Sequence, residues 1–349
     1  MTRQTWTAAV SALLFVLAAA VVAMTPVPYV TYAPGQTYDL LGSANGRPIV
    51  EVDGLDVYRD PGGILLTTVN ITRPDVPVGL PELLYAHGVP DREVFPREFV
   101  YPGRSTAGEI QARESQELTT SRADASAAAL RAAKIEVTQI PMVQSVNASG
   151  PAANKLIPGD FVLAVDGVDT PTTESVRAAV EDRAVGAPVT FTILRDRIVS
   201  AVTVETTGSK TQARVPVWGG TLGMGYSYDP RVTINVDQGV AGSSAGLMMA
   251  LAVYDLITPG GIVGARVVAG TGAIDGGGTV HEVGGVRQKL AGAQNAGAEI
   301  FFVPAENCVD LATATTSVRV VSVRTLQDAI NALIALGNPA TESQVEGCS

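Results

Sequence analysis

The chain has 349 residues, 46 % of them hydrophobic, so it is long enough for two or three domains and too apolar for a disordered protein. Its net charge is −10 and it has no long cluster of lysine and arginine, which argues against nucleic acid as a partner. Aromatic residues make up only 5 %, so the cores are expected to consist of small aliphatic side chains.

The first predicted element is an uncharged segment from Trp6 to Met24, about long enough to cross a bilayer core. Arg3 precedes this segment and the next basic residue is Arg47, so the positive-inside rule places the N-terminus in the cytoplasm and the rest of the chain outside. A cleaved signal peptide is the alternative, although Val-Ala-Met-Thr-Pro is a poor cleavage sequence. We expect a single-pass anchor in the cell membrane over residues 1–27.

Residues 28–124 are predicted to form an extracytoplasmic region with strands and a linker. Segments 49–52 and 63–71 have the composition of strands, and the second is rich in β-branched residues. Segment 74–103 is rich in proline, which favours a loop. Apolar residues at helical spacing then predict a helix over 107–133.

Residues 125–207 contain a series of short motifs that resemble a PDZ domain of the bacterial kind found beside proteases. The motifs are Pro-Ala-Ala at 151–153, Leu-x-Pro-Gly-Asp at 156–160, Asp-Gly at 166–167, a helix over 173–182 and a strand over 189–194. The resemblance implies that an extended peptide binds along a strand edge. Lys134 stands where a glycine of the carboxylate-binding loop is expected, so the alternative is a module that only positions its neighbour.

The run Gly242-Ser243-Ser244-Ala245-Gly246 opens an apolar helix that is predicted to extend from Ser244 to Ile257. A serine at such a helix start lies beside backbone N–H groups that can stabilise an oxyanion. The serine also needs a base to take its proton. Lys289 follows two glycines at 284–285, and burial can lower the pKa of a lysine by several units. A solvated helix lysine is the alternative.

These two motifs together resemble the proteolytic domain of Lon proteases over residues 215–336. The resemblance implies that Ser244 is the nucleophile and that Lys289, 45 positions later, is the general base. It also implies that Thr271, in a Gly-Thr-Gly turn, helps to hold the lysine. Independently of the resemblance, the small residues Gly242 and Ala245 let a substrate carbonyl come close to the serine.

The chain departs from the family pattern directly before the serine. The family usually has Asp-Gly-Pro there, whereas this chain has Ala241-Gly242-Ser243. Ser243 is therefore the alternative nucleophile, and an inert domain is the alternative to an enzyme.

Few other residues of the chain suggest chemistry. Cys308 and Cys348 either form a disulfide in an oxidising compartment, pinning the tail 337–349, or are unrelated thiols. The only histidines are His87 and His281, and the His-Glu-x-x-His metal motif is missing. We expect no metal and no cofactor.

The sequence thus predicts a multidomain protein that combines α+β and mixed α/β parts behind a transmembrane helix. We expect an ATP-independent, membrane-anchored serine endopeptidase whose PDZ-like domain recruits or positions substrates. The expected partners are unfolded or flexible polypeptides and the membrane, with no nucleic acid and no ATP, and a homo-oligomer is possible by analogy. The alternatives are an inert, membrane-tethered peptide-binding scaffold and a protein that cleaves only itself.

Overall fold

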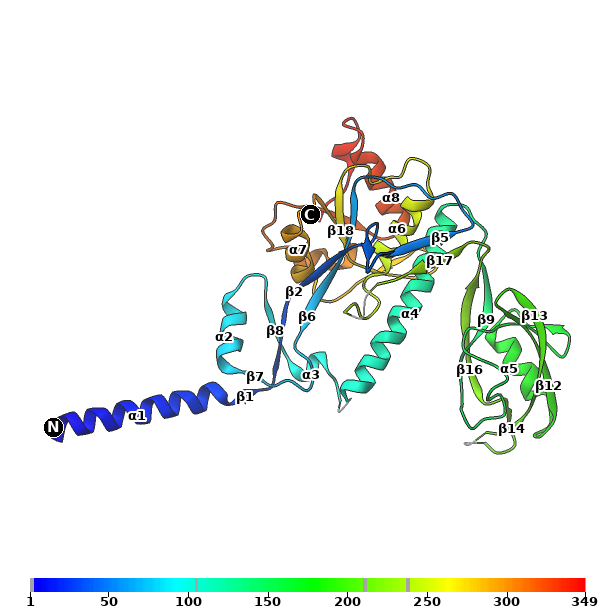
Figure 1. Ribbon diagram of the computed structural model, residues 1–349, viewed down its shortest axis with the longest axis horizontal. Helices are drawn as coiled ribbons and strands as arrows, with labels where there is room; N and C mark the ends of the chain where they lie inside the picture. The colour runs from blue at the N-terminus through cyan, green and yellow to red at the C-terminus, as the bar shows by residue number, and fades with distance from the viewer. Residues whose placement is uncertain (1–2, 104–105, 210–211, 237–238, 349) are drawn as a thin grey trace. The chain divides into compact units, whose positions relative to one another are not determined.

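The computed structural model describes all residues except 1–2, 104–105, 210–211, 237–238 and 349. It divides the chain into two compact units, Met1–Lys134 together with Pro230–Ser349, and Ile135–Asp229. We call the first the split unit and the second the inserted unit, because the second interrupts the sequence of the first (Figure 1).

The split unit is built on a six-stranded mixed sheet. In spatial order its strands are β22 (Arg319–Val323), β21 (Ile300–Pro304), β18 (Val267–Gly270), β6 (Gly63–Ile71), β2 (Tyr29–Asp39) and β8 (Glu93–Pro96). The first four strands are parallel and the last two pairings are antiparallel. β21 is buried along its whole length, which explains its continuous apolar sequence.

The structure corrects the expectation that residues 28–124 form a region of their own. Strand β6 pairs with β18, with Gly63 opposite Val267 and Leu66 opposite Gly270. β2 extends the same sheet on the far side of β6. A buried central strand needs hydrogen-bond partners on both edges, and for β18 one of them comes from about 200 residues earlier in the chain. Pairing over such a distance leaves no local sequence signal.

Three helices pack on this sheet, α6 (Gly246–Ile257), α7 (Val286–Asn295) and α8 (Leu326–Leu336). A fourth, α4 (Ala107–Ala132), packs on two of them to complete the core of the split unit. α4 begins with a capping box between Thr106 and Glu109 and packs against α6. α6 is apolar around nearly its whole circumference because it lies in the centre of the largest core cluster. α7 packs on β2 and β6.

The proline-rich segment 74–103 was expected to be a loop and is more regular than that. It contains β7 (Val78–Gly79), α2 (Leu80–Gly88), β8 and α3 (Arg97–Val100). Its strands are fixed by distant partners, since β7 pairs with β1 (Pro26–Val27) and β8 pairs with β2. Elements of two to four residues carry almost no periodic pattern, so composition alone does not reveal them.

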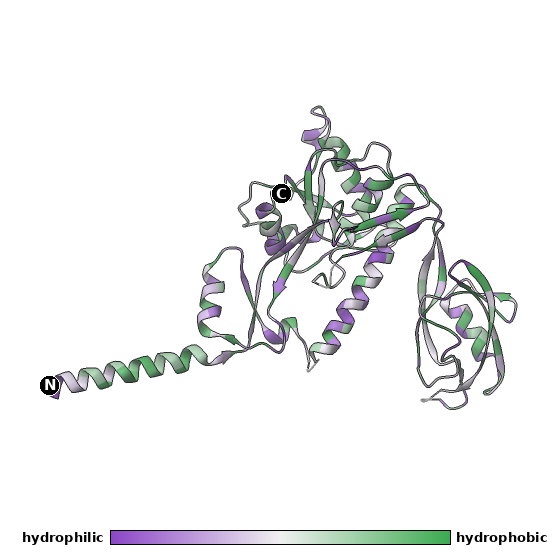
Figure 2. Cartoon of the chain, in the orientation of Figure 1, coloured by the Kyte–Doolittle hydropathy of each residue, from purple (hydrophilic) through white to green (hydrophobic). Residues whose placement is uncertain are grey.

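Helix α1 (Arg3–Met24) leads the chain and has no buried residue. In Figure 2 the ribbon of α1 has the hydrophobic colour over most of its length after the N-terminal end. Its length and composition fit a membrane span, and a signal sequence near the N-terminus fits the same criteria.

The inserted unit has its own sheet and its own core. Its strands follow the order β13 (Ile198–Glu205), β12 (Pro188–Arg195), β10 (Phe161–Val165), β9 (Thr138–Val146) and β16 (Gly220–Ser227), and β11 (Val168–Asp169) pairs with β10. Helix α5 (Thr173–Glu181) contacts β10 and β16. The rings of Phe191 and Trp218 pack 5.7 Å apart in the core.

Strand β16 corrects a second expected boundary. The sequence analysis placed it in the proteolytic segment 215–336, but it pairs with β9 from Gly220 opposite Val146 to Ser227 opposite Thr138. The smaller elements of the described chain are β3 (Ser43–Ala44), β4 (Arg47–Pro48), β5 (Val50–Asp53), β14 (Thr207–Gly208), β15 (Pro216–Val217), β17 (Arg231–Ile234), β19 (Ala273–Ile274), β20 (Val280–His281), η1 (Ala305–Leu311) and η2 (Glu342–Gln344).

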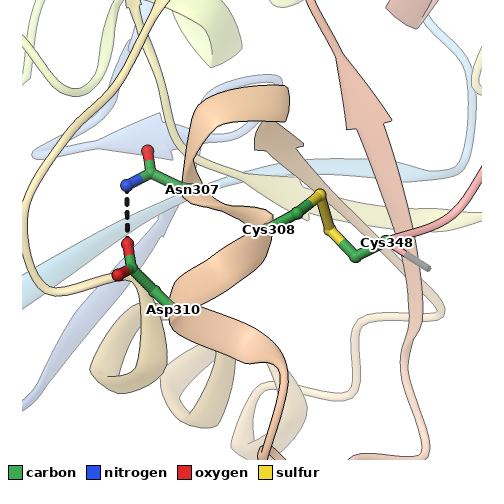
Figure 3. The surroundings of a disulfide bond; sticks show 4 residues. All are labelled: Asn307, Cys308, Asp310 and Cys348. Carbon is green, nitrogen blue, oxygen red and sulfur yellow. Dashed lines mark hydrogen bonds between the residues drawn. A yellow bond between two sulfur atoms is a disulfide. The ribbon is translucent and has the colours of Figure 1, made fainter.

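A disulfide joins Cys308 in η1 to Cys348 near the C-terminus, as Figure 3 shows. This confirms the predicted pairing over the alternative of two unrelated thiols. The bond closes a loop with a sequence separation of 40 residues around β22 and α8. It therefore ties the C-terminal tail to the η1 segment.

We expect Cys348→Ser to lower the free energy of unfolding of the split unit by about 3 kcal/mol, because the unfolded chain loses the restriction of a long closed loop. Urea denaturation in detergent micelles, with and without a reducing agent, measures the effect. Reduction should destabilise the wild type and leave Cys348→Ser unchanged. Equal denaturation midpoints for wild type and Cys348→Ser, each with and without the reducing agent, would refute a stabilising role of the disulfide.

Candidate active site

Ser244 lies in a tight turn directly before α6. The helix begins at Gly246, two residues later than expected, so the serine precedes the first helical turn. The amide of Gly246 donates to the carbonyl of Ser243 at 3.2 Å and closes the turn. Gly242 has a φ of +77°, a conformation that favours glycine and explains its place in the motif. Ser244 is half-buried and Ser243 is exposed.

The turn presents backbone donors beside the serine. Within the described residues, the N–H groups of Ser244 and Ala245 find no acceptor in the chain. Ala245 is the N-cap residue of α6, so these groups lie at the positive end of the helix dipole. An oxygen that gains negative charge next to Ser244 would meet donors already in place.

Lys289 lies in the first turn of α7 and is buried, with 4 % of its surface exposed. The alternative of a solvated helix lysine is therefore wrong. Burial lowers the pKa of Lys289 from its ordinary value to about 7, so an appreciable part of the amine is neutral near neutral pH. Gly285 caps the helix with a φ of +69°, and a Cβ there would approach Val69 to 2.6 Å.

Thr271 connects the lysine to the serine turn. The Nζ of Lys289 donates to Oγ1 of Thr271 at 3.1 Å, and this hydroxyl donates to the carbonyl of Ser244 at 3.1 Å. The amide of Gly272 donates to the same carbonyl at 2.9 Å. Among the described residues, no hydrogen bond joins the Ser244 hydroxyl directly to Lys289. The structure thus brings Ser244, Thr271 and Lys289 into one network through the threonine.

Asn307 supports the lysine segment and was not singled out in the sequence. Its side-chain oxygen accepts from the amide of Val283 at 2.9 Å, and its nitrogen donates to the carbonyl of Val283 at 3.0 Å. The nitrogen also donates to Asp310 at 2.7 Å (Figure 3). These bonds fix the chain directly before Gly284 and the start of α7. An asparagine in an irregular segment carries no motif that would reveal this role.

Helix α4 also reaches the serine turn, which the sequence analysis did not foresee. The Ser121 hydroxyl donates to the carbonyl of Ser243 at 3.1 Å. The two histidines lie elsewhere in the fold. His281 is exposed on β20, where its ring nitrogen lies 3.4 Å from Asp275, and His87 is exposed at the end of α2.

Chemically, the network offers a hydroxyl, an amine that is partly neutral at pH 7 and two free amide donors. A hydroxyl that transfers its proton to a neutral amine can attack a carbonyl carbon, and the amides can hold the resulting oxyanion. These are the requirements for acyl transfer.

Comparison with protein families agrees with this geometry. Residues 227–335 match the model of the Lon protease (S16) C-terminal proteolytic domain, and residues 121–206 match the PDZ domain. Both resemblances predicted from the motifs are confirmed. The matches begin and end within about a dozen residues of the predicted segments 215–336 and 125–207.

The chain is also similar to individual proteins. It is 33 % identical to a Lon protease of Clostridium beijerinckii over 105 residues, which are 29 % of this chain and 13 % of that protein. It is 32 % identical to Lon protease 2 of Bacillus subtilis over 126 residues, 36 % of this chain and 22 % of that protein. The chain therefore spans less than a quarter of the length of the curated relatives that it matches.

Solved structures are also similar to part of this chain, including the following two. One is the PDZ domain of an SdrC-like protein from Listeria monocytogenes, with 24 % identity, 24 % of this chain and 85 % of that chain covered, and a TM-score of 0.22. The other is a solution structure from Geobacillus thermodenitrificans, with 27 % identity, 24 % and 95 % covered, and a TM-score of 0.22.

Proposed function

Because the chain carries a Lon-type proteolytic domain and a PDZ domain, we propose that it is a serine endopeptidase with Ser244 as nucleophile and Lys289 as general base. The observation that supports this most is the buried amine of Lys289, whose hydrogen bond to Thr271 leads to the serine turn. A buried lysine with a pKa of about 7 is unusual outside functional sites.

In the proposed reaction, Lys289 takes the proton of the Ser244 hydroxyl while the serine oxygen bonds to the substrate carbonyl carbon. The carbonyl oxygen becomes an oxyanion beside the free amides of Ser244 and Ala245. Lys289 then returns the proton to the departing amine as the peptide bond breaks, and an ester remains on Ser244. In the second half, Lys289 takes a proton from a water molecule whose oxygen attacks the ester carbon. It then returns the proton to the Ser244 oxygen as the acyl product leaves.

The inserted unit would recruit or position the substrate through strand β16. β16 is an edge strand that faces α5, and its outer edge can accept an extended peptide by strand addition. Gly219 precedes it with a φ of +88°, and Gly220 is its first residue. We infer that these two glycines after Trp218, and not the segment at Lys134, offer the backbone loop for a bound peptide end. The substrates would be unfolded or flexible polypeptides.

We further propose that α1 anchors the protein in the cell membrane with its N-terminus in the cytoplasm and both units outside. The asymmetry of basic residues around α1 supports this orientation, and the Cys308–Cys348 disulfide fits an oxidising compartment. Cleavage there would proceed without ATP.

Casein-type cleavage by the full-length protein in detergent micelles, without nucleotide, tests this function. Wild type should release peptides, and the activity should be equal with and without ATP. Self-cleavage would be indicated if a serine-directed probe labels the protein, no added peptide is cleaved, and truncated chains appear in wild type but not in Ser244→Ala. No labelling and no turnover would leave a peptide-binding scaffold.

We expect kcat/KM for a neutral peptide to rise with pH through about 7 and to reach a plateau above it. The general base must be neutral to accept a proton. Below the pKa of Lys289 of about 7 the neutral fraction of its amine, and with it kcat/KM, should fall about tenfold for each pH unit. Initial rates between pH 5 and 9 measure this profile. A midpoint near the ordinary lysine pKa of about 10.4 would contradict a desolvated base.

A further inference from the structure

A cavity of about 240 Å³ lies between α4 and the serine turn, within the split unit. One face of α4 forms its wall, with residues spaced three or four apart: Arg113, Gln116, Glu117, Thr120, Ser121 and Asp124. Ser243 and Ile274 complete the lining. Figure 2 shows how much more polar α4 is than α1. The apolar pattern of α4 explains its packing on α6, but it does not explain this polar stripe.

The wall of the cavity is attached to the serine turn by hydrogen bonds. Besides the bond from Ser121 to Ser243, the amide of Gly242 donates to the carbonyl of Glu114 at 3.3 Å. A Cβ at Gly246 would lie 2.9 Å from both the Ser121 hydroxyl and the Ile274 side chain. The α4 stripe therefore lies against the residues on both sides of Ser244.

The size of the cavity suits a side chain. Sites for small-molecule ligands usually have about 300–1,000 Å³, so this cavity is small for an independent ligand. A peptide bound at Ser244 must run past this turn, and a residue beside its scissile bond can extend toward α4. The cavity is then a substrate subsite.

The charge of the cavity selects the side chain. Its lining carries two carboxylates, Glu117 and Asp124, and one guanidinium, Arg113. Glu117 takes part in no ion pair within the described residues, although Arg113 is one helical turn away. Glu117 also lies near Glu114, whose pKa is raised by burial and by the charge of Glu117. The local potential is negative, which favours a cation.

We propose that the α4 stripe, with Glu117 at its centre, forms a subsite that selects lysine or arginine next to the scissile bond. This inference rests on the proposed serine endopeptidase function and adds its substrate class. Glu117 would determine specificity, whereas Ser244 and Lys289 carry out the chemistry.

The test uses matched fluorogenic peptides that carry lysine, norleucine or glutamate at each position flanking the scissile bond. At one position, the full-length wild type should cleave the lysine peptide about threefold faster in kcat/KM, the gain of one exposed charge pair, because Glu117 is exposed. Glu117→Gln should remove this preference and leave the norleucine peptide unchanged. Glu117→Lys should reverse it, so that a glutamate peptide is preferred.

Glu205→Gln is the matched control, because it removes the same charge from an exposed position of β13, at the opposite edge of the inserted unit's sheet from β16. It should keep the preference for lysine. Two results would overturn the subsite: equal cleavage of all peptides by wild type, or an unchanged preference for lysine in Glu117→Gln. If the serine is still labelled and peptides are still cleaved, the endopeptidase function remains supported. Loss of all turnover and labelling in wild type would overturn both.

Discussion

Replacement of Ser244 by alanine is expected to reduce peptide-bond cleavage at least about a thousandfold, because the proposed ester forms on the hydroxyl that the variant lacks. The side chain is half-buried in a turn whose geometry is set by backbone hydrogen bonds, so the variant should fold like the wild type. Initial rates on a casein-type substrate and denaturation midpoints measure the two effects separately.

Ser243→Ala is the matched control for this variant. Ser243 is exposed and contributes its carbonyl, not its hydroxyl, to the bonds with Gly246 and Ser121. We expect it to retain most of the wild-type kcat. The opposite pattern, an active Ser244→Ala and an inactive Ser243→Ala, would assign the nucleophile to Ser243.

The second large effect is expected at Lys289. Lys289→Met keeps the length of the side chain and its packing but has no basic nitrogen, so cleavage should fall about as far as in Ser244→Ala. Lys289→Arg should be equally inactive because a guanidinium stays protonated. The arginine places a permanent charge in a buried site, so the methionine variant is the one that separates activity from folding.

Stability gives an independent readout of the same lysine. The folded pKa of about 7 lies below that of the unfolded chain, so between about pH 7 and 10 the unfolded state binds more protons. The free energy of unfolding of the wild type should therefore increase from about pH 7 to 10, and this increase is lost again as the pH falls toward 7. Lys289→Met should lack that rise. Parallel stability curves for the two proteins would mean that Lys289 titrates like an exposed lysine.

The sequence predicted the local parts of this protein well. The apolar helix after the Ser-Ala-Gly motif and helix α4 were predicted from glycines and apolar spacing, although α6 begins at Gly246 and not at Ser244. The PDZ and Lon-type motifs are equally local. The connection of Ser244 and Lys289 through Thr271 was implied only by the family resemblance, and the structure contains it as two hydrogen bonds.

The parts that sequence analysis missed depend on contacts between distant residues. β6 lies between β2 and β18 because strand pairing completes a buried sheet, and nothing in Gly63–Ile71 indicates which strand will be its neighbour. The contact of Ser121 with Ser243 spans 122 positions and an entire inserted unit. Apolar spacing predicted helix α4, but it indicated neither the polar stripe nor the serine turn that lies beside it.

The most direct test of the Ser-Lys dyad is mass-spectrometric mapping of the adduct formed by a peptidyl fluorophosphonate on the full-length protein in micelles at pH 6 and 8. The account predicts one adduct, on Ser244, formed much faster at pH 8 than at pH 6 and lost in Lys289→Met. An adduct on Ser243, or labelling of Ser244 at the same rate with and without Lys289, would contradict it.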